Sequence, residues 1–156
     1  MALLDKHFAQ EADRREISTR ELADLFLGEK IGAGISRIVY EHRQDPTVVV
    51  KHESGDGFAN QIEWNVWNIV KETPWAKWFA PCVDISPCGL WLIQKKVEFP
   101  PYEKYPAKMP FFFTDFKYRN YGRIGKQWVA CDYGDLSVLI SNGLTNRMRK
   151  AHWWKE

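Results

Sequence analysis

Four prolines lie between Glu98 and Pro110, at positions 100, 101, 106 and 110. A proline has no backbone N–H to donate, and it disfavours a helical conformation in the residue before it. Because no helix can run through this stretch, we expect an extended linker here. The linker divides the chain into a longer part before it and a shorter part after it.

The composition is that of one folded domain. The chain has 156 residues, of which 45% are hydrophobic, enough for a single core. Lys and Arg total 22, Asp and Glu total 20, and the net charge of +2 argues against a nucleic-acid partner. No run approaches the ~20 apolar residues of a membrane span, and Asp5 and Lys6 interrupt the place where a secretory signal would be apolar. The three cysteines form no C-x-x-C motif, so we expect a cytoplasmic protein without a disulfide framework or a zinc site.

The spacing of apolar residues predicts an α+β fold. Ser18 and Glu21 have the spacing of a capping box ahead of an apolar run, which indicates one or two short helices within residues 1–27. Runs rich in β-branched residues and separated by short turns predict antiparallel strands, and apolar residues in a helical arc predict helices. The expected strands are 30–40, 47–52, 82–85, 90–97, 121–124 and 127–131, and the expected helices are 58–72, 135–140 and 145–154.

Gly32 and Gly34 lie in a glycine-containing segment that runs to Val39, between β-like stretches. Glycines at this spacing let the backbone approach a phosphate group closely, and free N–H groups of such a turn can hold the anion. An ordinary hairpin turn explains the same two glycines. The motif alone does not separate these interpretations.

Lys51 ends a run of valines that reads as a buried strand. An ammonium group there needs an anionic partner, because burying it unpaired is costly. Glu63 follows twelve residues later, at the inner edge of the predicted helix, and is the candidate partner. The alternative is a surface lysine on an edge strand.

Later in the chain, carboxylate and amide side chains form a candidate ligand set. Asp115, Lys117 and Asn120 lie close together in sequence, and Asp132 begins an Asp-Tyr-Gly tripeptide after the next predicted hairpin. Carboxylate and amide oxygens suit Mg²⁺ with bound phosphates. Taken singly, an Asp or Asn in such a place more often forms a turn.

Between about residues 28 and 134 the order of these motifs resembles the protein-kinase family. Kinases carry a G-x-G-x-x-G-x-V loop, a V-A-I-K lysine, a glutamate on the next helix, an H-R-D-x-K-x-x-N loop and a D-F-G tripeptide. The matching residues are Gly32, Gly34, Val39, Lys51, Glu63, Asp115, Lys117, Asn120 and Asp132. After the helical extension predicted at 1–27, the resemblance implies an antiparallel β-rich N-lobe with one inserted helix at 28–98, and a much reduced C-lobe at 99–156.

The resemblance also implies ATP and Mg²⁺ as cofactors. Lys51, oriented by Glu63, would bind the α- and β-phosphates, and Asn120 and Asp132 would hold the metal. The strand at 90–97 with Glu98 would be the hinge against which the adenine stacks.

Asp115 and Lys117 would be the catalytic residues. Asp115 would accept the proton of an incoming protein Ser/Thr hydroxyl, while Lys117 would steady the γ-phosphate. Phosphoryl transfer depends mostly on positioning and electrostatic stabilisation, and every charged member of the set is present.

The chain also departs from the family. Arg37 stands at the third glycine of the loop, where it either obstructs the turn or offers a guanidinium to a phosphate. Phe113 and Thr114 replace the His-Arg pair before Asp115. About 16 residues separate the hinge from the Asp115 loop and 22 follow Gly134, too few for the helices and activation loop of a full kinase. Such reduced kinases resemble those of bacteriophages and bacterial effectors, which makes a host cytoplasm another possible location.

A second class of function remains open, a weak or inactive pseudokinase that binds or inhibits a partner protein. A core this small does not obviously bury every tryptophan, and exposed aromatic residues favour an interface; packing at helix edges is the other explanation. The residues concerned are Trp64, Trp67, Trp75, Trp78, Trp153 and Trp154.

Two further readings stay open. Small-molecule phosphotransferases share the spacing of Asp115, Asn120 and the later metal aspartate, although they usually have a larger second lobe. The basic tail at 146–155 could contact a membrane surface, a nucleic acid or a partner protein, and a cationic helix end is the expected explanation.

Overall fold

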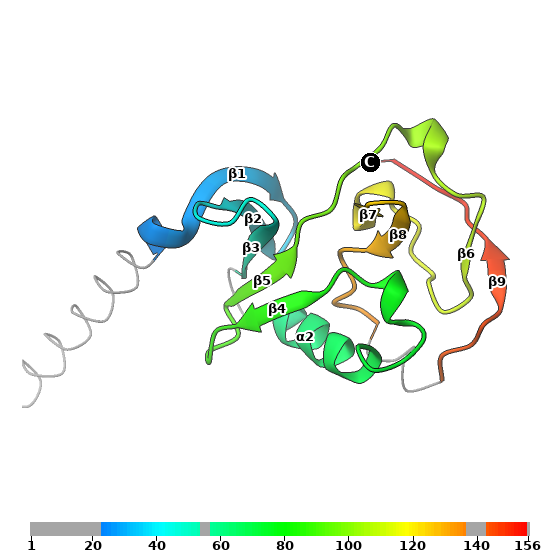
Figure 1. Cartoon of the computed structure of the whole chain (residues 1–156), viewed down its shortest axis with the longest axis horizontal. Helices are drawn as coiled ribbons and strands as arrows, with labels where there is room; N and C mark the ends of the chain where they lie inside the picture. Colours follow the sequence, from blue (N-terminus) through cyan, green and yellow to red (C-terminus); the bar gives the residue numbers. More distant parts are fainter. Residues whose placement is uncertain (1–22, 54–56, 137–142, 156) are drawn as a thin grey trace, which may run out of the picture.

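The computed structural model describes residues 23–53, 57–136 and 143–155 of the chain. Its architecture is α+β, as predicted, with mostly antiparallel strands and few helices (Figure 1). Most of the predicted N-terminal helical extension and most of the predicted helix at 135–140 lie outside the described residues. Among the residues that are described, no helix has the length and apolar character needed to cross a bilayer.

A five-stranded antiparallel sheet occupies the first part of the chain. Its strands, in spatial order, are β1 (Leu27–Ala33), β2 (Arg37–His42), β3 (Val48–Glu53), β5 (Trp91–Lys95) and β4 (Cys82–Ile85). The central strand β3 is buried over Val48–Lys51, as its run of valines requires. Gly89 has a positive φ of 76° in the β4–β5 turn, a conformation that favours glycine.

The single strand expected at 30–40 is two strands, β1 and β2, and this prediction was wrong. The chain turns at Gly34, whose N–H donates to the Arg37 carbonyl oxygen at 2.8 Å. Ile35 continues the β-branched pattern in sequence, yet it lies fully exposed at the turn. The β-branched pattern therefore did not mark the end of the strand, whereas the hairpin turn offered as an explanation of Gly32 and Gly34 is confirmed. The antiparallel pairing with the next strand, β3, is confirmed.

Helix α2 (Ala59–Val70) follows β3 and contacts β3, β4 and β5, so the helix predicted at 58–72 is confirmed (Figure 1). The side chains that it buries are Asn60, Glu63, Val66 and Val70. Two of these four are polar, which is unusual for the buried face of a short helix. Their partners form the candidate site described below.

Two small two-stranded antiparallel sheets make up the second part. They pair β6 (Lys108–Pro110) with β9 (Met148–Lys150), and β7 (Tyr121–Ile124) with β8 (Gln127–Ala130). Short 3₁₀ turns lie at η1 (Ala76–Trp78), η2 (Tyr102–Lys104) and η3 (Tyr118–Asn120). The hairpin β7–β8 was predicted from sequence and is confirmed.

The helix predicted at 145–154 is wrong, because this segment is extended and includes strand β9. Its backbone bonds to other parts of the chain: Ala151 N–H donates to the Ala107 oxygen at 3.0 Å, and Trp154 N–H donates to the Phe116 oxygen at 3.2 Å. Tertiary pairing thus outweighs local helical spacing.

The stretch 98–110 is more than the extended linker predicted from its prolines. It holds the η2 turn and strand β6, and it buries Tyr105, Met109 and Pro110. The segment therefore supplies part of the core, and only its lack of an α-helix was foreseen.

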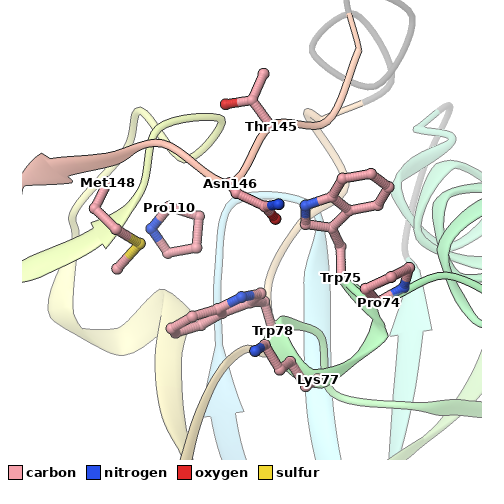
Figure 2. A pocket seen from close by; sticks show the side chains of 8 residues that line it. All are labelled: Pro74, Trp75, Lys77, Trp78, Pro110, Thr145, Asn146 and Met148. Atoms are coloured by element: carbon pink, nitrogen blue, oxygen red, sulfur yellow. The ribbon is translucent and has the colours of Figure 1, made fainter.

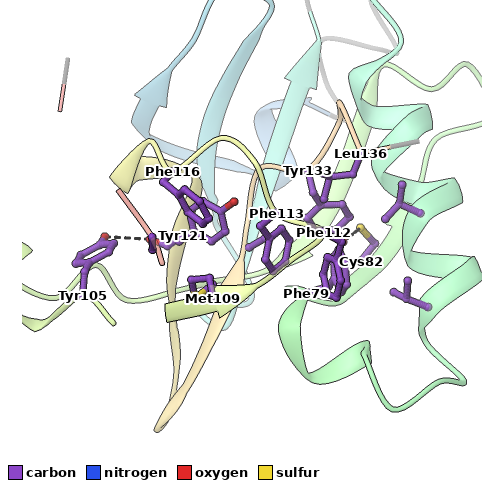
Figure 3. Packing of buried hydrophobic residues seen from close by; sticks show 14 of the residues in the cluster. Phe79, Cys82, Tyr105, Met109, Phe112, Phe113, Phe116, Tyr121, Tyr133 and Leu136 are labelled. Atoms are coloured by element: carbon purple, nitrogen blue, oxygen red, sulfur yellow. Dashed lines mark hydrogen bonds between the residues drawn. The ribbon is translucent and has the colours of Figure 1, made fainter. Parts of the chain in front are cut away.

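The core is unusually aromatic (Figure 3). The Phe79 ring packs edge-on against Tyr133 at 5.2 Å, and the Phe113 ring packs edge-on against Tyr121 at 5.3 Å. Edge-to-face arrangements of this kind are favourable for aromatic rings. The tryptophans that pack against this core are Trp64, Trp67, Trp75, Trp78, Trp128 and Trp153. Of those offered above as interface residues, Trp154 differs, since 45% of it is exposed.

Adjacent tryptophans near the end of the described chain allow a matched test. The Trp153 ring lies 4.9 Å from Tyr105 and 5.1 Å from Tyr121, and its Nε1 donates to the Pro106 oxygen at 2.7 Å. We expect Trp153→Ala to lower the free energy of unfolding by about 3 kcal/mol, because it leaves a cavity among rings. Trp154→Ala should cost less than about 1 kcal/mol, as is usual for exposed positions. Urea denaturation of both variants measures the difference, and equal losses would contradict this packing.

Candidate functional site

A buried ion pair joins strand β3 to helix α2. Lys51 Nζ donates to Glu63 Oε2 at 2.8 Å, and both side chains are buried. Lys51 also donates to the carbonyl oxygen of Cys131, just after β8. The structure thus brings together the two residues that the sequence analysis paired. The alternative of a lysine on an exposed edge strand is wrong, because β3 lies between β2 and β5.

The Glu63 carboxylate receives donors from three other segments of the chain. Besides Lys51, it accepts from Arg37 Nη2 at 2.9 Å and from the backbone N–H of Tyr133 at 3.0 Å, both through Oε1. These donors come from β3, from β2 and from the loop after β8. A carboxylate with no exposed surface needs such partners, because an unpaired buried charge is strongly unfavourable.

Arg37 lies at the centre of this cluster. Its guanidinium pairs with Glu63 and with Asp132, and Nη1 lies 3.5 Å from the Asn60 amide oxygen. Burial alone would lower the pKa of Arg37, but the two carboxylates raise it above its ordinary value. The guanidinium therefore stays charged and points into the site.

Asp132 is the most accessible member of the cluster, with 52% of its side chain exposed. Desolvation favours its neutral form, but the charges of Arg37 and Lys51 outweigh this and hold the pKa of the Asp132 carboxyl below its usual range. With Glu63, these groups form a quartet of two cations and two anions. Its formal charges sum to zero.

Two polar residues that the sequence analysis did not select support this quartet. Asn60 Nδ2 donates to the Lys51 carbonyl at 3.2 Å and to the Leu90 carbonyl at 3.0 Å, which ties α2 to β3 and to the residue just before β5. Glu53 accepts the N–H groups of Ala59 and Asn60 at 2.8 and 3.1 Å, at the start of α2. A carboxylate at a helix N-terminus is favourable because it satisfies free N–H groups there. The sequence offered no signal for Asn60, because at helical spacing it lies outside the arc of apolar residues expected to face inward.

The loop before β7 holds the other predicted polar residues. Asp115 is exposed, and its Oδ2 accepts from Asn120 Nδ2 at 3.0 Å while its Oδ1 accepts from the Lys117 N–H at 3.2 Å. The Lys117 ammonium lies over the Trp154 ring, 5.6 Å from its centre. The Asp115 carboxylate is thus oriented by its own loop and remains open to solvent.

Backbone hydrogen bonds connect this loop to the quartet. The Asn120 carbonyl accepts the N–H of Cys131 at 2.8 Å and that of Asp132 at 3.3 Å. Asn120 and Asp132, the predicted metal ligands, are therefore neighbours. Across the described part of the chain, no three His, Cys, Asp or Glu side chains are grouped as metal ligands.

Gly32, Gly34 and Val39 belong to the β1–β2 hairpin, with Gly32 opposite Val39. This hairpin also carries Arg37, so the glycine-containing turn and the quartet belong to one element. The structure brings Arg37, rather than the glycines, into contact with the charged groups.

Glu98 forms the connection between the two parts of the chain. Its N–H and C=O pair with the backbone of Arg123 at 2.9 and 2.8 Å. A Cβ at position 122 would lie 2.7 Å from the Glu98 oxygen, so the close approach requires Gly122. A pocket of about 490 Å³ opens beside Glu98, lined also by the β2–β3 turn and Ile124. The backbone of Glu98 itself is bonded within the protein.

A second pocket, of about 270 Å³, lies between the η1 region and the segment before β9 (Figure 2). The indoles of Trp75 and Trp78 line it, together with the Asn146 side chain. The Trp75 Nε1 is buried and has no hydrogen-bond partner among the described residues. None of the predicted site residues lines this pocket.

No protein-family model, curated protein or solved structure matches this chain. Inference about its function therefore depends on the geometry of its own residues.

Glu63 provides the first test of the site. We expect Glu63→Gln to lower the free energy of unfolding by about 3–5 kcal/mol, because it removes a buried charge that Lys51 and Arg37 both need. The control is Glu41→Gln, which breaks the exposed pair with Lys96 at 2.6 Å and should cost less than about 1 kcal/mol. Chemical denaturation of the two variants compares them directly, and a small loss at Glu63 would refute its bridging role.

Asp132 provides a pH test. Because folding lowers the pKa of this carboxyl, its ionised form stabilises the fold above the unfolded pKa of about 3.9, and this stabilisation is lost as the pH falls through the lower folded value. The difference in unfolding free energy between wild type and Asp132→Asn should therefore shrink as the solution is acidified below about pH 4. Denaturation curves between pH 3 and pH 7 measure it. A difference that does not change over this interval would contradict the assignment.

Proposed function

We propose that the chain is an ATP-binding, kinase-like domain with a truncated C-lobe that transfers the γ-phosphate of ATP to a protein Ser/Thr hydroxyl. The observation that carries the proposal is the buried pair between Lys51 and Glu63 beside Asp132. In protein kinases a strand lysine and a helix glutamate pair in this way, next to a metal-binding aspartate. The order of the five-stranded sheet, with its helix between the third and fourth strands, supports the same proposal.

The residues present fit a nucleotide with its metal on one condition. Lys51 offers an ammonium to phosphate oxygens, while Asp132 and Asn120 offer oxygens of the type that Mg²⁺ prefers. Mg²⁺·ATP, when bound, supplies the phosphoryl group and neutralises charge on it. The condition is that the inward contacts open. Arg37 leaves Asp132, which it occupies as an ion pair, and the Lys51 ammonium, which is buried against Glu63 and the Cys131 oxygen, is uncovered.

Asp115 has the position of a general base. Its carboxylate is exposed, and the Asn120 amide and the Lys117 N–H fix its orientation. In the proposed step the Ser/Thr oxygen forms a bond to the γ-phosphorus, the bond to the β-phosphate oxygen breaks, ADP leaves, and the hydroxyl proton passes to Asp115.

One observation favours a second candidate, an inactive pseudokinase that acts by binding a partner protein. The ion pair between Arg37 and Asp132 keeps the metal-binding carboxylate occupied. A chain in which this pair never opens would keep the scaffold of a kinase without its metal chemistry. The two candidates differ in their response to Mg²⁺·ATP.

Thermal unfolding with ATP, with and without Mg²⁺, tests the proposal. A ligand that binds only the folded state stabilises it by about 2.7 kcal/mol at a hundredfold excess over its dissociation constant. We expect a magnesium-dependent rise of the midpoint in wild type, a larger rise in Arg37→Gly, which frees Asp132, and none in Asp132→Asn.

The matched control is Asp115→Asn, which should bind Mg²⁺·ATP as wild type does and lose transfer of phosphate from labelled ATP to protein. A nucleotide shift without any transfer in wild type would favour the pseudokinase. If millimolar ATP moves the midpoint of neither wild type nor Arg37→Gly, nucleotide binding is refuted.

A further inference from the structure

The two parts of the described chain differ sharply in charge. The first part, residues 23–53 and 57–100, contains eight Lys or Arg and nine Asp or Glu. The second part, residues 101–136 and 143–155, contains ten Lys or Arg and four Asp or Glu. The net charge of +2 for the whole sequence conceals this separation. The surface of the second part is therefore basic.

Four of these cations lie on or next to the β6–β9 sheet, and we call Lys108, Arg147, Arg149 and Lys150 the basic ribbon. Lys108 stands directly opposite Lys150 in the register of the two strands. Like charges in such cross-strand positions repel each other, so the pair is unfavourable unless an anion lies nearby. Within the described chain, no carboxylate forms an ion pair with any member of the basic ribbon.

Stacking on aromatic rings restricts the two arginines. The guanidiniums of Arg147 and Arg149 lie over the Phe111 ring, 5.5 and 5.3 Å from its centre, and Phe111 is half exposed. A guanidinium held in this way loses less conformational freedom when it binds, and its planar fork matches a carboxylate. Arg147 and Arg149 therefore present ordered donors for acidic side chains. Lys108 and Lys150 project from the other face of the two strands relative to Arg149 and add positive charge there.

The basic ribbon lies beside the loop that carries Asp115. Arg149 also contacts the Phe116 ring at 5.8 Å, and Phe116 directly follows Asp115 in the chain. Phe111, which carries both guanidiniums, lies four residues before Asp115. A protein segment bound along the basic ribbon would thus have its hydroxyl groups near the Asp115 carboxylate.

We propose that the basic ribbon binds an acidic segment of the protein substrate, so that the phosphorylated Ser or Thr is flanked by Asp or Glu. This inference rests on the proposed function, and it adds the substrate class. An acidic protein segment fits better than a nucleic acid, because the basic ribbon lies beside the loop at which the proposed function places a protein hydroxyl group, and because the net charge of +2 argues against a dedicated nucleic-acid surface.

Peptide binding tests the basic ribbon without requiring catalysis. Fluorescein-labelled peptides with one Ser between two Glu-Glu pairs, or between two Lys-Lys pairs, are titrated into the full chain and followed by anisotropy at low salt, without ATP. We expect the acidic peptide to bind at least about tenfold more tightly than the basic one, and added salt to weaken it. Arg147→Glu combined with Lys150→Glu should weaken acidic-peptide binding by about tenfold or more.

The control variant carries Lys30→Glu and Lys71→Glu, exposed positions in the first part of the chain, and changes the net charge equally. Its affinity should stay within about twofold of wild type. Equal binding of both peptides, or equal loss in both variants, would overturn the inference. Tighter binding of an oligothymidine than of the acidic peptide would overturn the choice of a protein partner.

Transfer assays keep the two proposals separable. If wild type binds the acidic peptide but transfers no phosphate, the binding surface is supported and the proposed phosphotransfer function is refuted. If wild type transfers phosphate with no preference for the acidic peptide, the proposed function is supported and the proposed binding of acidic segments by the basic ribbon is refuted.

Discussion

The carboxylate of Glu63 connects the two parts of this chain through hydrogen bonds. Its partners lie on β2, on β3 and in the loop after β8, so the position of helix α2, the inward direction of the Arg37 side chain and the placement of the loop with Asp132 all depend on it. A buried anion tolerates little displacement, because each donor that moves away leaves charge without compensation. Apolar packing around α2 would allow the helix to slide, whereas these directional contacts do not.

Arg37 changes what this site can do. The sequence analysis allowed it either to obstruct the turn or to offer a guanidinium to a phosphate, and in the structure the guanidinium bonds inward to Glu63 and Asp132. The formal charges of the site therefore sum to zero without a ligand. A site that contains only carboxylates would instead need a metal ion to neutralise them. An incoming anion competes with carboxylates for the same guanidinium, and an incoming cation competes with the guanidinium for Asp132.

Local patterns predicted the parts of the fold in which sequence neighbours pair. An apolar or β-branched pattern is visible in the sequence of the helix at 59–70 and of the strands β3, β4, β5, β7 and β8. The burial of Lys51 required an anionic partner, and Glu63 on the next helix supplies it. The three-residue strands β6 and β9 show no period, and each is formed only because the other is present. The sequence analysis missed Asn60 and Glu53 for a related reason. Their hydrogen-bond partners are backbone groups that come near them only in the folded chain.

The C-terminal segment that pairs with residues 107–118 has a consequence for the order of folding. The hairpins β1–β2, β2–β3 and β4–β5 join near neighbours in sequence, and such contacts form early because they close short loops. The loop with Asp115 is instead held by Ala151–Trp154, so its closure comes late and its release comes early. Partial unfolding should thus detach this loop first, while Lys51, Arg37 and Glu63 stay paired and lose at most their links to Cys131, Asp132 and Tyr133. The chain would then keep a folded sheet and helix after the carboxylate proposed for proton transfer had lost its place.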